Sequence, residues 1–391
     1  MKHTTSQTLR PSLVTRFSRD LAFLCAMLMT AIALPNLPVR AQEATCKQPQ
    51  PVCEGRSAVF PISAFDPVGS AVRIADTVLV TSRHVVADET DIDVFLPDGK
   101  KIKAKPIPTD YKGDVILLSA PDLPPGPILA PADTGIAATV HTIGADVSFG
   151  RIRAYAPGVI KLLPAAGKPL ARLHHTAYNQ PGNSGGALVD EKGNLVGIVA
   201  SGGEGRLEAV PANALDSLKE RSGPDYAEAS AEIGAAVRIC TLKLDEARTV
   251  QGALEQQDAN AIGTSCRRTG NRQFFDLAAQ AFGSRRMIDE SLALFEASLD
   301  QDPNSLNGRL GLAITYHFAA RYEEELPHLR FLRQHLPEDL QVLRLAIQAG
   351  IWGDDPEFAQ SAFDTLKKIN PNMAPAAERF LKSPPPRPPR R

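Results

Sequence analysis

The chain has 391 residues, of which 43% are hydrophobic and 22% charged, and its net charge at pH 7 is −1. This composition is ordinary for a globular protein with a hydrophobic core, and the length allows two domains with extensions. A nearly neutral chain offers no electrostatic reason to bind nucleic acid or an anionic membrane surface.

The first 41 residues have the pattern of a secretory signal. Basic residues between Lys2 and Arg19 precede an apolar run from Leu21 to Leu34, and Ala41 ends a small-x-small cleavage site. We therefore expect residues 1–41 to be removed and the protein to be exported, either periplasmic or secreted. The apolar run is shorter than the roughly 20 residues that span a bilayer. We expect no stable membrane insertion after cleavage, and an uncleaved anchor is the alternative.

Four cysteines follow this segment: Cys46, Cys53, Cys240 and Cys266. An even number of cysteines in an exported chain suggests disulfides, and three pairings are possible. Nearness along the chain favours Cys46–Cys53, in an N-terminal extension over residues 42–56, and Cys240–Cys266 in the second half. Free buried thiols are the alternative.

Three polar residues, each next to an apolar run, indicate nucleophilic catalysis. His84 follows a run that ends at Val80, Asp114 precedes another that begins at Val115, and Ser184 lies in Gly182-Asn183-Ser184-Gly185-Gly186 before a third. A serine hydroxyl is a weak nucleophile, so it needs a base within hydrogen-bond reach and a carboxylate to orient that base. We therefore assign Ser184 as nucleophile, His84 as base and Asp114 as orienting acid. The backbone N–H groups of Gly182 and Ser184 would form the oxyanion hole.

This order of His, Asp and Ser resembles that of the trypsin/chymotrypsin-like proteases, and it is most similar to the bacterial high-temperature-requirement (HtrA) type. The resemblance rests on Thr-x-x-His-Val-Val at 81–86, Pro-Asp-Gly at 97–99 and the glycine-flanked serine, and it covers about residues 57–222. It implies an all-β fold of two six-stranded barrels. It also implies a serine endopeptidase that hydrolyses peptide bonds through an acyl-enzyme without a cofactor.

The resemblance implies a role for Tyr178 as well, six residues before the serine. This position would lie at the base of the pocket for the residue that precedes the cut. Because tyrosine is uncharged, we expect an uncharged side chain there, and the resemblance implies a small or medium aliphatic one. The sequence contains no His-Glu-x-x-His, Cys-x-x-Cys or phosphate-binding glycine loop, so it predicts neither metal nor nucleotide chemistry.

After about residue 225, helical spacing replaces the alternating apolar pattern. Residues 223–270 predict a helical connector that matches no module. Over residues 271–380, Pro303, Pro337 and Pro371 recur every 34 residues, and each closes an amphipathic stretch. This period resembles the tetratricopeptide repeat, which implies stacked helix pairs with a concave groove for peptides or partner proteins. An ordinary helical cap with a coincidental proline period is the alternative.

Two residues depart from that repeat pattern. Gly350 stands where the first two repeats have an aromatic residue. Pro327 falls early in the second helix of the middle repeat, where it must occupy the first turn or kink the helix. The HtrA type carries PDZ domains after the protease domain, and here the helical repeats stand in that place. The trimerisation of that type is therefore not carried over to this chain.

Residues 381–391 are rich in proline and arginine, so they predict a tail that is disordered or polyproline-like. Taken together, the sequence predicts an exported serine endopeptidase whose helical repeats recruit protein partners or substrates. The alternative is a catalytically silent, protease-like scaffold whose repeats bind a partner.

Overall fold

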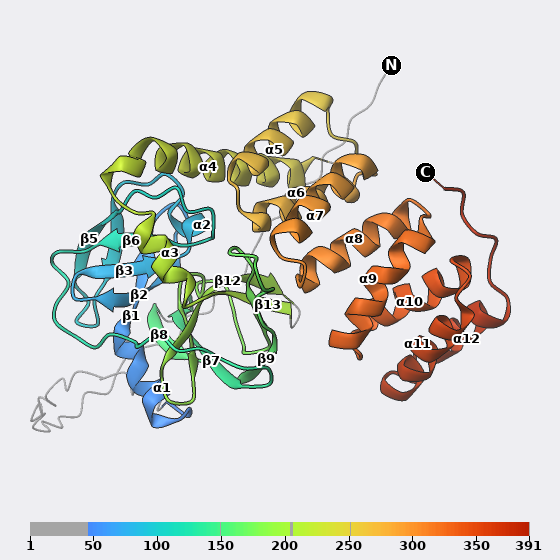
Figure 1. Cartoon of the computed structure of the whole chain (residues 1–391), viewed down its shortest axis with the longest axis horizontal. Helices are drawn as coiled ribbons and strands as arrows, with labels where there is room; N and C mark the ends of the chain where they lie inside the picture. The colour runs from blue at the N-terminus through green and yellow to red at the C-terminus, as the bar shows by residue number, and fades with distance from the viewer. Residues whose placement is uncertain (1–45, 149, 204–205, 251, 391) are drawn as a thin grey trace, which may run out of the picture. The chain divides into compact units, whose positions relative to one another are not determined.

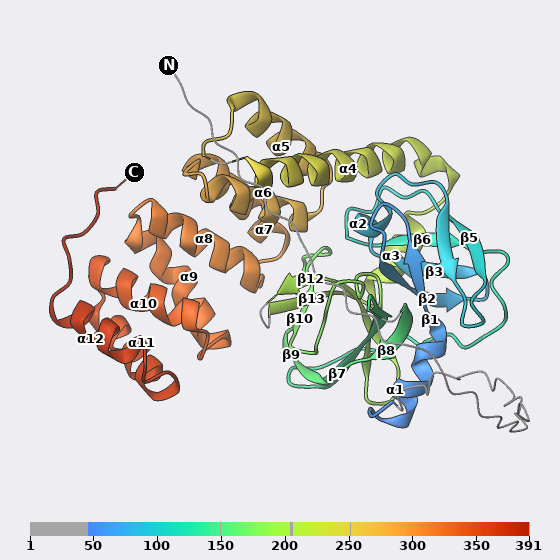
Figure 2. The ribbon, with the colours of Figure 1, turned by 180° about the vertical axis from the view of Figure 1, so that it is seen from behind.

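The computed structural model describes residues 46–148, 150–203, 206–250 and 252–390, in which strands dominate the first half and helices the second (Figures 1 and 2). The predicted signal segment, residues 1–41, lies outside the described residues. A short helix, α1 (Gln50–Glu54), and the 3₁₀ helix η1 (Gly55–Ala58) lead into the first strand.

Six antiparallel strands close the first barrel in the order β1-β2-β3-β6-β5-β4. These strands are β1 (Val59–Ser63), β2 (Gly69–Ala75), β3 (Val78–Thr81), β4 (Ile92–Phe95), β5 (Lys101–Pro106) and β6 (Ile116–Ser119). Their inward side chains, among them Leu79, Val94 and Leu118, are fully buried. The alternation of buried and exposed residues is what a closed sheet around an apolar core requires.

The second barrel forms from the next seven strands. These are β7 (Thr139–Asp146), β8 (Arg151–Ala154), β9 (Gly158–Leu162), β10 (Leu173–His175), β11 (Ala187–Asp190), β12 (Leu195–Gly203) and β13 (Arg206–Pro211). Pairing of β11 with β7 closes six of them into a ring, and β8 pairs with β7 outside it. The predicted pair of six-stranded barrels is confirmed.

Four helical elements follow the barrels: α3 (Ala214–Glu220), η2 (Pro224–Tyr226), α4 (Ala227–Thr249) and α5 (Gln256–Arg268). The structure contains the disulfides Cys46–Cys53 and Cys240–Cys266, the pairing favoured by sequence, and the second joins α4 to α5. None of the helices in the described part of the chain combines the length and apolar character needed to cross a bilayer.

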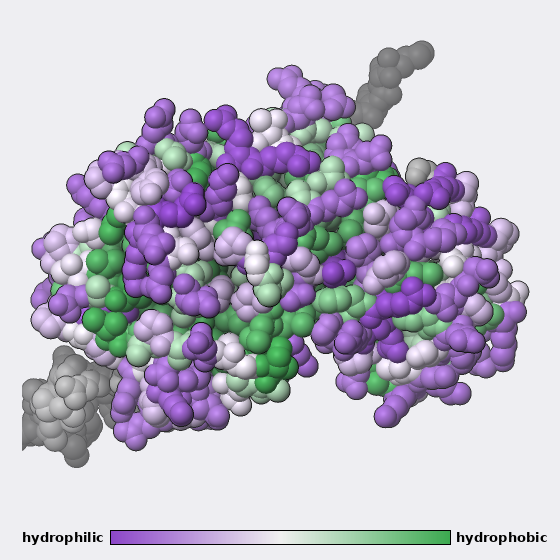
Figure 3. All heavy atoms as spheres, viewed as in Figure 1, coloured by the Kyte–Doolittle hydropathy of each residue, from purple (hydrophilic) through white to green (hydrophobic). Residues whose placement is uncertain are grey.

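Six further helices form three pairs: α6 (Arg272–Gly283) with α7 (Ile288–Gln301), α8 (Leu306–Phe318) with α9 (Tyr322–His335), and α10 (Leu340–Trp352) with α11 (Pro356–Ile369). First helices begin at 272, 306 and 340 and second helices at 288, 322 and 356, so both sets repeat every 34 residues. A last helix, α12 (Ala374–Lys382), packs on α10 and α11. On the face in Figure 3, hydrophilic side chains cover most of α8–α12, and hydrophobic ones gather mainly over the barrels.

The two departures from the repeat pattern have local explanations. A Cβ atom added to Gly350 would lie 2.8 Å from the Cβ of Ala359, so the missing aromatic lets α10 and α11 approach closely. Pro327 lies inside α9, beyond its first turn, where its ring removes one backbone hydrogen bond of the helix.

A buried ionic cluster joins the second barrel to the helices. Its members are Arg172, His174, Glu208, Arg272 and Asp302, each at most 2% exposed. Glu208 on β13 pairs with Arg172 at 3.2 Å and with Arg272 of α6, and Asp302 accepts from His174 Nε2 at 3.2 Å. Burial alone would raise the pKa of Glu208, but Arg272 and Arg172 outweigh it and hold that pKa well below its usual value.

Candidate active site

The three candidate catalytic residues come from both barrels. His84 lies on α2 (Arg83–Val86), a single turn directly after β3, and Asp114 lies two residues before β6. Strands β3 and β6 are paired with Thr81 opposite Ile116, which brings positions 30 residues apart to one end of the barrel. Ser184 lies in the glycine-rich turn before β11 of the second barrel.

His84 and Asp114 form a close, buried pair. The Nδ1 of His84 lies 2.7 Å from Oδ2 of Asp114, and the backbone N–H of His84 donates to Oδ1 at 3.1 Å. Asp114 is fully buried. Burial disfavours the imidazolium, but the Asp114 carboxylate outweighs it and raises the pKa of His84. Burial would likewise raise the pKa of Asp114, and His84 lowers it instead. Each group in its charged form thus stabilises the charged form of the other.

The serine turn packs against the segment that leads into α2. The Ser184 carbonyl oxygen accepts from the Ser70 N–H at 2.9 Å, and Ser82 Oγ donates to the Val199 carbonyl at 3.1 Å. A Cβ atom on Gly185 would lie 2.2 Å from the Ser70 oxygen and 2.8 Å from the Ser82 nitrogen. Only glycine allows this approach, which sets the turn next to the residues just before His84.

The serine hydroxyl is turned toward its own barrel. Its Oγ donates to the Ala200 carbonyl oxygen at 3.3 Å, and within the described residues it makes no hydrogen bond with His84. The structure thus brings two of the three predicted side chains together and holds the third on a neighbouring turn. Rotation about χ1 is the movement that changes the direction of a serine hydroxyl.

The two backbone N–H groups expected to form the oxyanion hole belong to Gly182 and Ser184, on either side of Asn183. Gly182 has a φ of +92°, a conformation that favours glycine. Neither its N–H nor that of Ser184 has an acceptor among the described residues. Ser70 Oγ donates to the Gly182 carbonyl at 2.7 Å, and the buried Asn183 side chain donates to the Ala145 carbonyl at 3.0 Å. These two contacts hold the turn against the first barrel and β7.

The helix that carries His84 has a second support that the sequence did not reveal. The buried Arg83 guanidinium donates to the Ser230 hydroxyl at 3.2 Å and also bonds the Ser230 carbonyl on α4. A Cβ atom on Gly234 would lie 2.5 Å from the Ala87 carbonyl oxygen, and Arg238 pairs with Asp88 at 2.5 Å. Residues 230, 234 and 238 are four apart and share one helix face. In the sequence, a serine, a glycine and an arginine at this four-residue spacing were the pattern that could have indicated the contact between α4 and α2.

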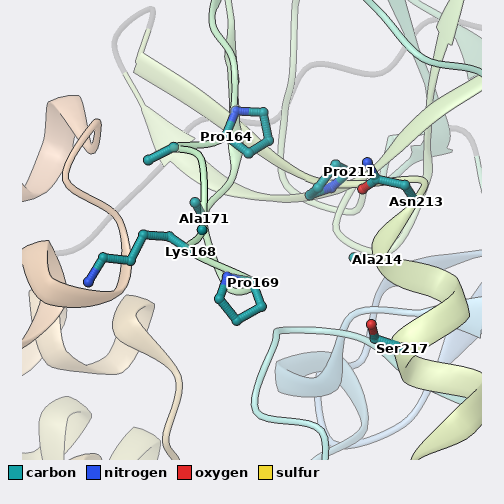
Figure 4. Close-up of a pocket in the computed structure, with 10 residues that line it drawn as sticks. Pro164, Lys168, Pro169, Ala171, Pro211, Asn213, Ala214 and Ser217 are labelled. Carbon is teal, nitrogen blue, oxygen red and sulfur yellow. The ribbon is translucent and has the colours of Figure 1, made fainter.

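Tyr178, the expected pocket residue, is 51% exposed and stacks on Tyr155 with 5.6 Å between ring centroids. A separate pocket of about 460 Å³ lies elsewhere, between the loop after β9 and α3 (Figure 4). Residues such as Pro169, Pro211 and Ser217 line it, and the candidate catalytic residues and Tyr178 do not.

Comparison with known proteins gives consistent matches for the barrels. Residues 69–198 match the trypsin-like peptidase domain family. The periplasmic serine endoprotease DegP of Escherichia coli is 30% identical over 194 residues, which are 45% of this chain and 41% of DegP. A probable DegP-like periplasmic endoprotease of Pseudomonas fluorescens is 35% identical over 132 residues, or 32% of this chain and 27% of that protein. The chain thus spans less than half the length of these curated relatives.

Solved structures are similar to the barrel region as well. The HtrA-type protease AlgW with a tripeptide is 29% identical, covering 44% of this chain and 62% of AlgW with a TM-score of 0.38. The Rv3671c protease in its inactive form is 24% identical, covering 44% of this chain and 93% of that one with a TM-score of 0.40. In sequence, the barrel region is thus similar to trypsin-like peptidase domains and to relatives of the HtrA/DegP type.

Proposed function

We propose that this chain is an exported serine endopeptidase that uses Ser184, His84 and Asp114. The observation that carries the proposal is the buried pair of His84 and Asp114, 2.7 Å apart, next to a glycine-held serine turn. A carboxylate on Nδ1 leaves Nε2 as the nitrogen that takes a proton from a nucleophile. The names of the matched relatives, which are periplasmic serine endoproteases, support the same activity and compartment.

In the proposed reaction, Ser184 Oγ attacks the carbonyl carbon of a peptide bond while its proton passes to His84 Nε2. The carbonyl oxygen becomes an oxyanion that accepts from the N–H groups of Gly182 and Ser184. The intermediate collapses to an acyl-enzyme as the imidazolium gives its proton to the leaving amine. Water then attacks the ester with His84 again as base, which regenerates the serine. Asp114 keeps the imidazole oriented throughout and stabilises its charged form.

We further propose that the helical pairs recruit a protein partner or substrate. A stack of helix pairs with a 34-residue period presents an extended surface that a single pair lacks. This arrangement is similar to that of tetratricopeptide repeats. Export is supported by the two disulfides, because such bonds persist in oxidising compartments.

One observation favours a second candidate, a protease-like scaffold without turnover. The Ser184 hydroxyl bonds the Ala200 carbonyl rather than the imidazole. A serine kept in this orientation would not be deprotonated, and the helical pairs would then carry the function alone.

Labelling of the purified chain with a fluorophosphonate separates the two candidates, since this reagent forms a covalent bond only with an activated serine. We expect stoichiometric labelling that is lost in S184A and unchanged in S217A, a control at an exposed serine of α3. Cleavage of casein should follow the same pattern. Failure of the wild type to label, also with unfolded casein present, would establish the scaffold instead.

A further inference from the structure

The proline- and arginine-rich tail contacts the helices at specific points, although residues 383–390 stay exposed to solvent. After α12, residues 383–390 run back over the helices as an extended segment without regular secondary structure (Figures 1 and 2). The indole N–H of Trp352, at the end of α10, donates to the Pro385 carbonyl oxygen at 3.1 Å. The tail expected over residues 381–391 begins later, because α12 extends to Lys382, and its disordered or polyproline-like character stays a prediction.

Two arginines of the tail reach two consecutive acids at the start of α9. Arg387 forms a bidentate pair with Glu323, with N–O distances of 2.6 and 2.8 Å. Arg390 pairs with Glu324. The Arg387 guanidinium holds the pKa of the Glu323 carboxyl below its usual value. A bidentate pair adds directional specificity to charge, which a single exposed ion pair does not supply.

Aromatic side chains form the floor beneath this segment. Trp352 lies 5.1 Å from the Tyr322 ring and 5.0 Å from the Phe380 ring, the latter edge to face. Arg387 lies over the Tyr322 ring at 5.2 Å, so its guanidinium contacts an aromatic face and a carboxylate together. Tyr322 is only 1% exposed. The site therefore combines an aromatic floor, an indole donor and an acidic rim.

This combination suits a polyproline II ligand. Proline has no N–H, so such a ligand offers carbonyl oxygens, which an indole N–H can bind. The polyproline II helix has three residues per turn, so Arg387 and Arg390 lie on the same side of it. Both arginines then face α9, where Arg387 pairs with Glu323 and Arg390 with Glu324. A chain stiffened by proline also loses little conformational entropy on binding.

We propose that Trp352, Tyr322, Glu323 and Glu324 form a recognition site for basic, proline-rich segments, which the chain's own tail occupies until a partner's segment of the same chemistry displaces it. This inference rests on the recruiting role proposed for the helical pairs and names the class of partner. A tethered tail acts at an effective concentration in the millimolar range, so a free segment must compete with it.

Trp352 is the only tryptophan in the sequence, so its fluorescence reports on this site alone. The experiment uses full-length S184A, which cannot cleave an added peptide by the proposed mechanism. A second protein carries R387A and R390A as well, to release the tail. Each is titrated with a synthetic peptide of residues 383–391. We expect saturable fluorescence change in the released protein, and an apparent Kd about 10-fold or more higher with the native tail.

Controls at the rim test the chemistry of recognition. In the released protein, E323K should weaken peptide binding at least 10-fold, and a peptide with glutamate in place of Arg387, the residue that pairs with Glu323, should recover binding to E323K. The matched control is E357K, which makes the same charge change in the first turn of α11, where the tail has no contact. Sedimentation of the full-length chain should give a monomer whose mass does not depend on the tail.

Three results would overturn the inference: no peptide binding to the released protein, equal binding to E323K, or a dimer lost on tail release. The outcome is separable from that of the proposed enzyme, because peptide binding is read at Trp352 and activity at Ser184. A chain that labels with fluorophosphonate but ignores the peptide contradicts only the recognition site. A chain that binds the peptide but does not label contradicts only the endopeptidase.

Discussion

At the scale of single residues, His84 sets the pH range of the proposed reaction. Asp114 raises the pKa of the imidazole above its ordinary value of 6.5, in spite of burial. Only the neutral imidazole accepts a proton, so kcat/KM should fall as pH decreases through a midpoint above 6.5. The pH profile of kcat/KM measures this midpoint, and an acid limb centred below 6.5 would contradict it.

The same pair predicts the effect of removing the orienting charge. D114N should reduce kcat/KM by about 10⁴-fold, since the amide supports the wrong tautomer of His84, as in the related triad. It should also lower the pKa of His84. D110N is the matched control, because Asp110 pairs with Arg221 at the surface, and we expect less than a twofold change there. Steady-state kinetics of both variants tests the prediction, which a small loss in D114N would refute.

The sequence predicted the acid, base and serine because each stands beside its own apolar strand, where local pattern fixes position. The direction of the Ser184 hydroxyl was beyond prediction, since it depends on the Ala200 carbonyl across a barrel strand. The Ser70 hydroxyl, which bonds the Gly182 carbonyl, was missed for the same reason. Such contacts depend on register between distant strands, and single-sequence patterns do not contain that register.

At the scale of elements, α4 supports the helix turn that carries His84. G234A places a Cβ atom on α4 only 2.5 Å from the carbonyl oxygen of Ala87, which directly follows α2. Helices α4 and α2 must therefore move apart. We expect a loss of about 1–3 kcal/mol in unfolding free energy. We also expect kcat to fall with KM little changed, since His84 and not the substrate surface is displaced.

G263A is the control for helix propensity. Its new Cβ atom would meet Phe282 at 3.9 Å, an ordinary contact, so this variant should gain up to about 1 kcal/mol. Chemical denaturation and kinetics of both glycine variants make the comparison. Equal behaviour of the two would show that α4 does not hold α2.

The helix pairs were predictable because three prolines, at equal spacing, each lie two residues after a helix end. The 34-residue period can be recognised in the sequence without knowing which helices contact each other. The connector was not predictable in the same way. Its long helix α4 buries small residues such as Ser230 and Gly234 against the segment around α2 of the first barrel. Because these residues are not large and apolar, the sequence of α4 shows no apolar stripe that would indicate the contact.

At the scale of the whole molecule, the buried ionic cluster makes the helices part of the second barrel. D302N removes one charge from a site where His174 and Arg272 both face it at 3.2 and 3.4 Å. Breaking one partner of a buried network leaves uncompensated charge, so we expect a loss of about 3–5 kcal/mol.

D300N makes the same change two residues away, where Asp300 pairs with Lys168 at the surface. An exposed pair of this kind contributes about 0–1 kcal/mol, so this variant should be nearly neutral. Equilibrium unfolding in urea compares the two. A D302N protein as stable as D300N would mean that the cluster does not join the domains.

The contacts of α4 with α2 and of α6 with β13 give the helical half a mechanical meaning. His84 belongs to the first barrel and Ser184 to the second, so the distance between them changes if the two barrels slide past each other. Because α4 contacts the first barrel and α6 contacts the second, the helices restrict movement of one barrel against the other. A bound protein that pulls on the helix pairs would therefore change the distance between His84 and Ser184, over which the proposed proton transfer takes place.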